Sequence, residues 1–207
     1  AVDIVKNTLN TEVNGNICQL IQNLGGMPVK LEGNQIFSCS KLLQKDKDGN
    51  DIDLGFVGSI NSVDNNRITK FTTEGYIPVI SSVGANTEGQ SYNINADVAA
   101  SAVASALHAR RLLYLCDVPG LLKDPNDPDS LISTLHVDEV ESLKESGIIG
   151  SGMLPKTDSA ISAIRHGVRR VHFVSGFVEH SILLEIFTAK GIGTEIVQDT
   201  SPWRATH

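Results

Sequence analysis

The sequence predicts an α/β fold: a three-layer α/β/α sandwich around a mostly parallel central sheet. Continuous apolar runs such as Leu112–Cys116 are typical of parallel strands that are covered on both faces. Such runs alternate with helical segments across short connections, and repeated strand–helix–strand units produce a parallel sheet between helices. The 207 residues are enough for one sizeable core. Because no repeat, low-complexity tract or flexible linker interrupts them, we expect one domain, 1–207.

The first third of the chain is less regular than the rest. Val2, Val5 and Leu9 follow a helical period from the first residues, so we interpret the chain as a segment of a longer polypeptide. The other expected elements are a helix over Asn14–Leu24 before Gly25-Gly26, strands over Met27–Leu31, Ile36–Leu43 and Leu54–Ser62, and a helix from Asp64 or Asn65 to Glu74. The polar loop 45–51 predicts a β-hairpin excursion near 36–62, because Asp-Gly and Asn favour tight turns.

The remaining two thirds alternate strands with helices. The expected strands are the apolar runs Ile77–Ser81, Leu112–Cys116 and Val171–Val174. The expected helices are Val98–Ala109, Asp138–Ser146 with Asp138 as N-cap, a helix from Pro155 to Gly167, and Glu179–Ala189 before Lys190-Gly191. Glycine directly after a helical segment marks its carboxyl end.

Composition excludes several classes of function. The net charge of −7 argues against nucleic acid as a partner. No apolar run approaches the roughly 18 residues that cross a bilayer, and the first residues lack the pattern of a signal peptide. The three cysteines form no CxxC pair and the six histidines show no ligand spacing, so we expect neither a disulfide framework nor a metal site built by the protein. A reducing, soluble compartment follows, either a bacterial cytoplasm or an organelle matrix or stroma.

The most informative segment is Tyr92–Asp97, which leads directly into an alanine-rich helix. Asn93, Asn95 and Asp97 crowd the start of that helix. Unpaired N–H groups and the positive end of the dipole attract anions there. These side chains are therefore either helix caps or groups that act on a ligand.

Three further polar or glycine-rich segments map to predicted strand ends, where open parallel sheets bind ligands. They are Asp117–Gly120, Ser175-Gly176 and Gly191–Thr194. Composition alone also allows the first of these to be an ordinary turn, so their convergence is more informative than any one of them.

Lys156 stands in the first turn of a predicted helix. A lysine there faces the positive end of the dipole, an arrangement unfavourable by roughly 0.3 to 1 kcal/mol unless an anion binds beside it. Phosphate would reverse that penalty, because helix amides and the ammonium would act on the same charge. The alternative is a helix start over Gly152–Lys156 with a solvated lysine.

Six motifs resemble, in order and spacing, those of the amino-acid kinase family, over nearly the whole chain up to Val197. They are Leu54–Gly58, Gly75–Ile80, Tyr92–Asp97, Asp117–Leu121, Gly152–Lys156 and Gly191–Thr194. The match is closest to members that phosphorylate the side-chain carboxylate of N-acetyl-L-glutamate with ATP and Mg²⁺ in arginine biosynthesis. The resemblance implies that 1–76 belongs to the substrate side, that 77–197 forms the nucleotide side and that 198–207 is a tail.

The resemblance also implies residue roles. Lys156 would stabilise the phosphoryl group in transfer, and Asp97 would orient the catalytic lysines instead of acting as a base. Asn93 and Asn95 would bind the acylamino-acid substrate. The nucleotide would be bordered by Asp117, Val118, Pro119, Gly120, Leu121, Leu122, Ile148, Ile149 and Gly150, with Gly152 and Met153 shaping its site. Magnesium would be held mainly by the nucleotide.

The chain departs from the family's pattern at its front. Family members carry a lysine on the first strand, two glycine-rich phosphate loops and a substrate-binding arginine, which no segment here replaces. Because one preorganised charge donor is worth about 10²- to 10³-fold in rate, we expect the segment alone to be inactive or nearly so.

Three alternatives stay open. The first is a kinase for another acidic amino-acid derivative, such as an aminoadipate derivative. The second is a non-catalytic nucleotide-binding or regulatory relative, and the third is a purely structural interaction domain. The resemblance also suggests a homo-oligomer, either a dimer or a hexamer of dimers. In parts of the family the oligomeric enzyme is inhibited by arginine or bound by a PII-type signalling protein.

Overall fold

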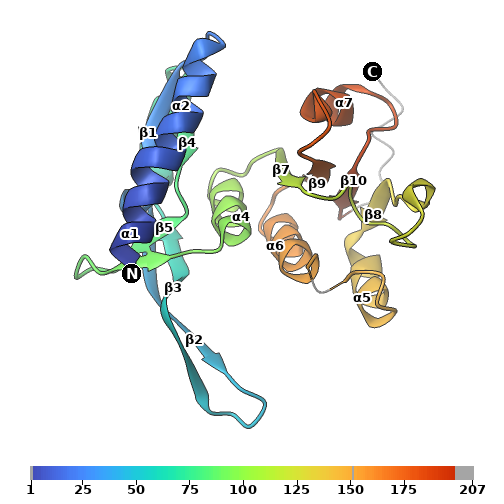
Figure 1. Cartoon of the computed structure of the whole chain (residues 1–207), viewed down its shortest axis with the longest axis horizontal. Helices are drawn as coiled ribbons and strands as arrows, with labels where there is room; N and C mark the ends of the chain where they lie inside the picture. The colour runs from blue at the N-terminus through green and yellow to red at the C-terminus, as the bar shows by residue number, and fades with distance from the viewer. Residues whose placement is uncertain (1, 151, 199–207) are drawn as a thin grey trace. The chain divides into compact units, whose positions relative to one another are not determined.

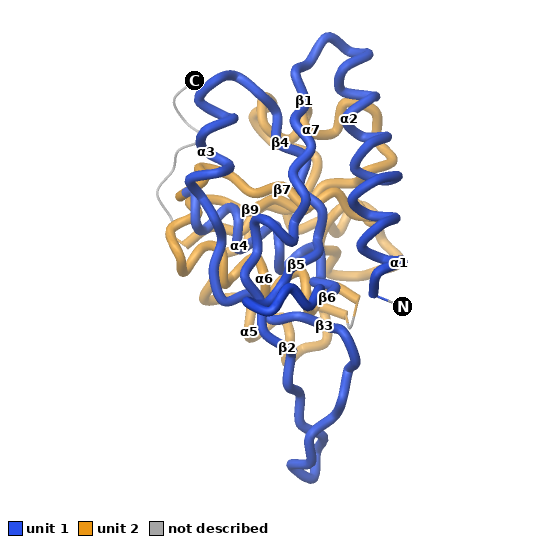
Figure 2. The backbone as a smooth tube through the Cα atoms, turned by 90° about the vertical axis from the view of Figure 1, so that its left-hand side faces the viewer, with its two compact units in different colours: residues 1–107 blue, residues 108–207 orange. Residues whose placement is uncertain are grey.

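The computed structural model describes residues 2–150 and 152–198 (Figure 1). The chain divides into two compact units, 1–107 and 108–207, which Figure 2 draws in different colours. Both units contain strands that alternate with helices, so the predicted α/β class is confirmed. In the described part of the chain, no helix is both long enough and apolar enough to cross a membrane.

Unit 1 begins with a long helical run, seen at the blue end of Figure 1. It consists of α1 (Val2–Asn7), a π-helical segment (Thr8–Val13) and α2 (Asn14–Asn23). Asn14 faces inward and is buried, and its Nδ2 donates to the carbonyl oxygen of Val79 at 2.8 Å. This amide contact fixes the helix on the sheet beneath it. Gly25, with φ of +83°, ends the run as the sequence predicted.

Unit 1 holds two sheets. Parallel strands β1 (Pro28–Leu31) and β4 (Ile77–Ile80) form one of them, and α2 packs against both strands. The second sheet closes on itself in the order β2-β3-β6-β5. Its strands are β2 (Phe37–Lys45), β3 (Asp51–Val63), β5 (Val83–Ala85) and β6 (Ser91–Asn93). The outer halves of β2 and β3 form the predicted hairpin arm (Figure 1).

Three shorter elements complete unit 1. Helix α3 (Asn65–Thr73) is capped by Asp64, whose carboxylate accepts from the amide of Arg67 at 3.1 Å. Helix α4 (Ala96–Ala106) follows β6, and a 3₁₀ turn spans Gly33–Gln35. The core comprises Leu31, Ile36, Phe37, Cys39, Ile68, Tyr92, Ile94 and Ala99. Because this core contains Tyr92 and Ile94, it fixes the segment that leads into α4.

Unit 2 contains one sheet with strand order β7-β9-β10-β8. These strands are β7 (Arg111–Cys116), β8 (Thr134–His136), β9 (Arg170–Ser175) and β10 (Thr194–Val197). Pairing is parallel between β7 and β9 and between β8 and β10, whereas β9 and β10 are antiparallel. Helices α6 (Leu154–Arg165) and α7 (Ser181–Phe187) lie on opposite faces of the sheet (Figure 1). The other elements are α5 (Val137–Glu145) and a 3₁₀ turn at Pro128–Ser130.

The prediction that Asp138 is an N-cap is wrong. Helix α5 begins at Val137 with His136 in the cap position, and Asp138 lies in the first turn. The physical reason is Glu139, whose carboxylate accepts from the amide of His136 at 2.8 Å and lets the helix start earlier.

Two other helices differ from prediction in their bounds. Helix α7 is shorter than expected because His180 has φ of +57° and Thr188 is extended, which interrupts the helical path at both ends. Helix α4 begins two residues earlier than expected because Asn95 caps it, and it ends three residues earlier, at Ala106, because His108 has φ of +47°.

Candidate functional site

In unit 1, the start of α4 adjoins the carboxyl end of β4. The amide of Ile94 donates to the carbonyl oxygen of Ser82, just beyond β4, at 3.0 Å. Asn93 ends β6 and pairs in register with Val57 of β3 and Val83 of β5. The predicted position of this segment at strand ends is therefore confirmed.

Asn95 is the N-cap of α4. Its Oδ1 accepts from the amides of Asp97 at 2.8 Å and Val98 at 3.2 Å. Asn93 is exposed and Asp97 is half-buried in the first turn. Asn95 therefore supplies the side-chain cap, with Asp97 in the first turn directly after it.

In unit 2, three segments meet at the carboxyl edge of the sheet. Cys116 and Ser175 are register partners at the ends of β7 and β9, and the amide of Gly176 donates to the carbonyl oxygen of Cys116 at 2.8 Å. Strand β10 is antiparallel to β9 and starts at Thr194 opposite Phe173, so the preceding loop reaches the same edge. The prediction that these three segments of unit 2 lie together at strand ends is confirmed.

The loop after β7 has a buried anchor and an exposed rim. Leu121 is buried, and its amide donates to Oγ1 of Thr194 at 2.8 Å. Asp117 and Pro119 are exposed at the rim, while Val118 and Leu122 are half-buried. The hydrogen bond to Thr194 thus anchors the loop, and the exposed residues of the loop face solvent along the carboxyl edge of the sheet.

Lys156 lies in the first turn of α6 and is half-buried. A 12-residue helix is about 18 Å long and a six-residue strand about 20 Å, and α6 packs back against β9 and β10 after a short turn. The first turn of α6 therefore lies toward the carboxyl edge of β9. Pro155 occupies the favoured early position of the helix.

The segment before α6 combines a buried anchor with open glycines. Ile149 is buried and its amide donates to the carbonyl oxygen of Leu143 at 3.1 Å, while Ile148 and Met153 are half-buried. A Cβ added to Gly150 or Gly152 would meet no heavy atom within 4 Å. Backbone amides beside free space suit a phosphate-bearing ligand.

The sequence-predicted site residues thus form two groups, one in each unit. Asn93, Asn95 and Asp97 belong to unit 1, and the loops around Asp117–Leu122 and Ile148–Lys156 belong to unit 2. Ser151 lies outside the described residues.

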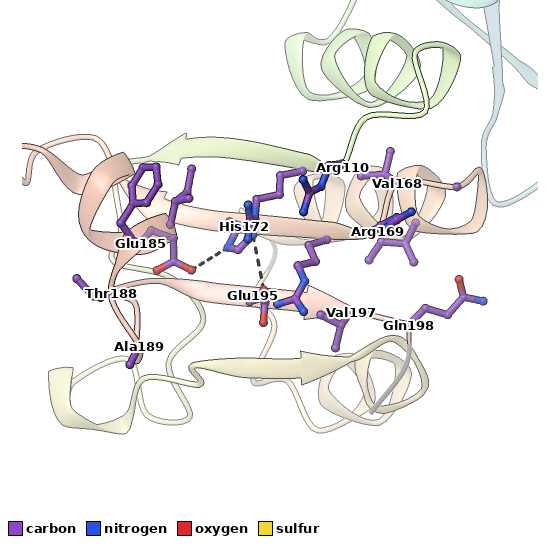
Figure 3. A pocket seen from close by; sticks show the side chains of 16 residues that line it. Arg110, Val168, Arg169, His172, Glu185, Thr188, Ala189, Glu195, Val197 and Gln198 are labelled. Atoms are coloured by element: carbon purple, nitrogen blue, oxygen red, sulfur yellow. Dashed lines mark hydrogen bonds and ion pairs between the residues drawn. The ribbon is translucent and has the colours of Figure 1, made fainter. Parts of the chain in front are cut away.

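Unit 2 also contains a cavity of about 790 Å³ that the sequence did not predict (Figure 3). Near its centre, Nδ1 of His172 lies 2.8 Å from Glu185, and Arg170 pairs with Glu195 at 2.6 Å. His172 Nε2 is buried without a hydrogen-bond partner and lies 3.7 Å from Glu195. A histidine inside an otherwise apolar strand was the one sequence signal for this cluster.

Glu185 is an ionised group in the interior of unit 2. Burial by itself would raise the pKa of the carboxyl, but hydrogen bonds from His172 and from the amides of Gly193 and Ile192 outweigh it. The pKa of Glu185 therefore lies below its ordinary value, because each of these donors stabilises the carboxylate.

The sequence pattern of the Amino acid kinase family matches residues 2–175, so the chain belongs to that family. The acetylglutamate kinase of Desulforamulus reducens is 45% identical over 96% of this chain and 67% of its own length. The acetylglutamate kinase of Methanothermobacter thermautotrophicus is 44% identical over 95% of this chain and 70% of its length.

One solved structure is similar to this chain in fold. The protein smu.665 of Streptococcus mutans UA159 superimposes with a TM-score of 0.73 at 26% identity. The match covers 93% of this chain and 70% of that protein. The expected amino-acid kinase fold is confirmed.

Proposed function

We propose that the protein phosphorylates the side-chain carboxylate of N-acetyl-L-glutamate with Mg-ATP, as a step of arginine biosynthesis. The observation that carries the proposal is the identity of 38% to 45% with proteins named acetylglutamate kinase, over 94% to 96% of this chain. Matches of this extent span both groups of polar residues described above, which lie between Asn93 and Lys156.

The reaction needs charge neutralisation more than it needs a base. The acceptor carboxylate is already an anion at neutral pH, so no proton has to leave it. Bound Mg-ATP would supply the γ-phosphoryl group, whose bond to the β-phosphate oxygen breaks as a carboxylate oxygen bonds to phosphorus. The products are an acyl phosphate and ADP. Positive charge and amide donors stabilise such a transfer.

Lys156 is the residue to which we assign this neutralisation. Its position in the first turn of α6 adds an ammonium to the amides of a helix start. To Asp97 we assign the orienting of catalytic lysines, because a carboxylate keeps an ammonium charged and directed. Asn93 and Asn95 would bind the acylamino-acid, and Asn95 has the additional task of capping α4.

We assign the nucleotide to the carboxyl edge of unit 2. Open space beside Gly150 and Gly152 lies next to backbone amides, and the loop after β7 presents an exposed rim. Among residues 2–150 and 152–198, no group of three or more His, Cys, Asp and Glu side chains could hold a metal ion. We assign Mg²⁺ mainly to the phosphates of the nucleotide.

The test is trapping of the acyl phosphate. The protein as its gene encodes it is incubated with Mg-ATP, N-acetyl-L-glutamate and hydroxylamine, which converts the acyl phosphate to a coloured hydroxamate. We expect hydroxamate and ADP in equal amounts, and neither when the acceptor is omitted. ADP without hydroxamate, or no turnover, contradicts the proposal.

Two further measurements separate the alternatives. An N-acyl-aminoadipate acceptor that reacts faster than N-acetyl-L-glutamate would assign another substrate. Binding of Mg-ADP by calorimetry without turnover would favour a non-catalytic relative. The remaining parts of the proposal are a homo-oligomer, inhibition by arginine or binding of a PII-type partner, and a cytoplasmic or organelle location. Mass in solution and an arginine titration of the assay test the first two.

A further inference from the structure

One buried hydroxyl connects the start of β10 to the loop after β7. Oγ1 of Thr194 accepts from the amide of Leu121 at 2.8 Å, between residues 73 positions apart. Thr194 is fully buried and Leu121 is almost fully buried. A hydrogen bond in such a place is costly to lose, because the buried amide would then have no partner.

The position of Thr194 is itself fixed from two sides. It is the first residue of β10 and pairs with Phe173 of β9. The residue before it, Gly193, donates its amide to Glu185 at 2.8 Å, as does Ile192. Strand pairing and the hydrogen bonds to the Glu185 carboxylate thus fix the position of the Thr194 hydroxyl at the carboxyl edge of the sheet.

Glycine lets the two segments approach each other closely. A Cβ on Gly193 would lie 2.1 Å from the carbonyl oxygen of Phe173. Gly120 has φ of +154°, and a Cβ there would lie 2.5 Å from Oγ1 of Thr194. Any larger residue at position 120 would therefore push the loop away from the threonine.

We infer that Thr194 is a positioning residue for nucleotide binding. Its hydroxyl holds Leu121 in place and so sets the position of the residues before it, of which Asp117 and Pro119 form the exposed rim of the loop. Thr194 does not itself touch the nucleotide, because it is fully buried beneath that rim. The inference rests on the proposed function, which assigns this loop to the nucleotide.

The test replaces the hydroxyl with a group of the same shape. In the protein as its gene encodes it, Thr194→Val removes the acceptor, Thr194→Ser keeps it, and Thr134→Val makes the same change at an exposed threonine of β8. We expect Thr194→Val to raise the dissociation constant for Mg-ADP and the KM for Mg-ATP about 5- to 50-fold, since a buried amide loses its partner. Turnover and the KM for N-acetyl-L-glutamate should change less than about threefold, because the reacting groups stay in place.

The pattern across variants separates positioning from general damage. Thr194→Ser should bind Mg-ADP nearly as the wild type does, and Thr134→Val should be indistinguishable from it. A general loss of structure would lower turnover at unchanged KM instead. A folded Thr194→Val that binds Mg-ADP as tightly as the wild type overturns the inference.

A second variant covers the case in which Thr194→Val does not fold. Gly120→Ala presses on the same hydroxyl from the loop side, and we expect it to weaken Mg-ADP binding as well. Unchanged binding in Gly120→Ala would count against the inference. If the wild type binds no Mg-ADP, the proposed function fails. Amide exchange then decides the structural part: slow exchange at Leu121 supports the tie to Thr194, and fast exchange refutes it.

Discussion

His172 and Glu185 form a buried pair that joins β9 to α7. Nδ1 of His172 lies 2.8 Å from Oε1 of Glu185, and the two side chains are 3% and 0% exposed (Figure 3). The other carboxylate oxygen accepts from the amides of Ile192 and Gly193 at 2.8 Å each. One carboxylate therefore fixes a helix, a strand and the loop that precedes β10.

Stability should fall in acid because of this carboxylate. Although burial favours the neutral acid, the hydrogen bonds outweigh it and the pKa of Glu185 lies below the ordinary 4.5. The unfolded chain then binds more protons than the folded one, so the contribution of Glu185 is present above pH 4.5 and is lost as pH falls through its folded pKa. Urea unfolding between pH 6 and about 3 measures this loss.

Glu185→Gln tests the assignment of that loss to one residue. The variant should be about 3 kcal/mol less stable at pH 7, because a buried pair loses its charge, and its stability should change less with pH. Glu179→Gln alters a glutamate that is 90% exposed and should keep the wild-type pH dependence. Equal pH dependence in Glu185→Gln and the wild type would assign the acid loss to other groups.

Asn95 should matter for stability as a helix cap. Asn95→Ala removes the acceptor for the amides of Asp97 and Val98 and should lower the free energy of unfolding by about 1 kcal/mol. Asn95→Ser retains a capping oxygen and should recover most of the loss. Thermal and urea unfolding measure both variants, and an Asn95→Ala variant of wild-type stability would refute the cap.

Asn93 should matter for substrate binding and very little for stability. It is exposed at the end of β6, so Asn93→Ala should change the free energy of unfolding by less than about 0.5 kcal/mol. If it contacts the acylamino-acid, the KM for N-acetyl-L-glutamate should rise about tenfold, the loss of one hydrogen bond. The hydroxamate assay gives this value. A change in stability without a change in KM would remove Asn93 from the substrate site.

The cysteines should differ in reactivity. Cys39 is buried against Gly84, and burial raises its pKa to about 11, so roughly one thiol in a thousand is ionised at pH 8. Cys18 is half-buried; burial raises its pKa and nearby Lys30 partly opposes that rise. Iodoacetamide at pH 8 should therefore label Cys18 first, and Cys39 and buried Cys116 only after unfolding. Peptide masses at timed intervals decide this, and native labelling of Cys39 at the rate of Cys18 would contradict it.

The sequence predicted the elements of the fold well where a single period dominates. The strand at Leu112–Cys116 was predicted because burial on both faces leaves a continuous apolar run. The helix after Asp64 was predicted because its capping residue is a local pattern in the sequence. The closure of β2, β3, β5 and β6 into one sheet left no such pattern. It depends on β5 and β6, two three-residue strands that pair with residues far away in the chain, and no local period encodes that pairing.

The candidate site was predictable to the extent that glycine and polar residues mark strand ends. Asp117 and Gly176 were placed correctly at the carboxyl edge because each directly follows an apolar run. The buried cluster of His172, Glu185 and Glu195 was not foreseen. Its members are 13 and 10 residues apart in sequence, a spacing that matches neither a helix nor a strand. The packing of α7 on β9 brings Glu185 to His172, and the antiparallel pairing of β9 with β10 places Glu195 opposite His172.

The central claim is that Lys156 acts on the phosphoryl group in transfer. The most direct measurement is the single-turnover rate of acyl phosphate formation in Lys156→Ala at saturating Mg-ATP, beside its dissociation constant for Mg-ATP. Lys144→Ala is the control, because that lysine pairs with Asp158 at 2.6 Å and has no role assigned in the transfer. We expect the rate of Lys156→Ala to fall about 10²- to 10³-fold while the dissociation constant rises far less, and Lys144→Ala to keep the wild-type rate. A wild-type rate in Lys156→Ala would contradict the account.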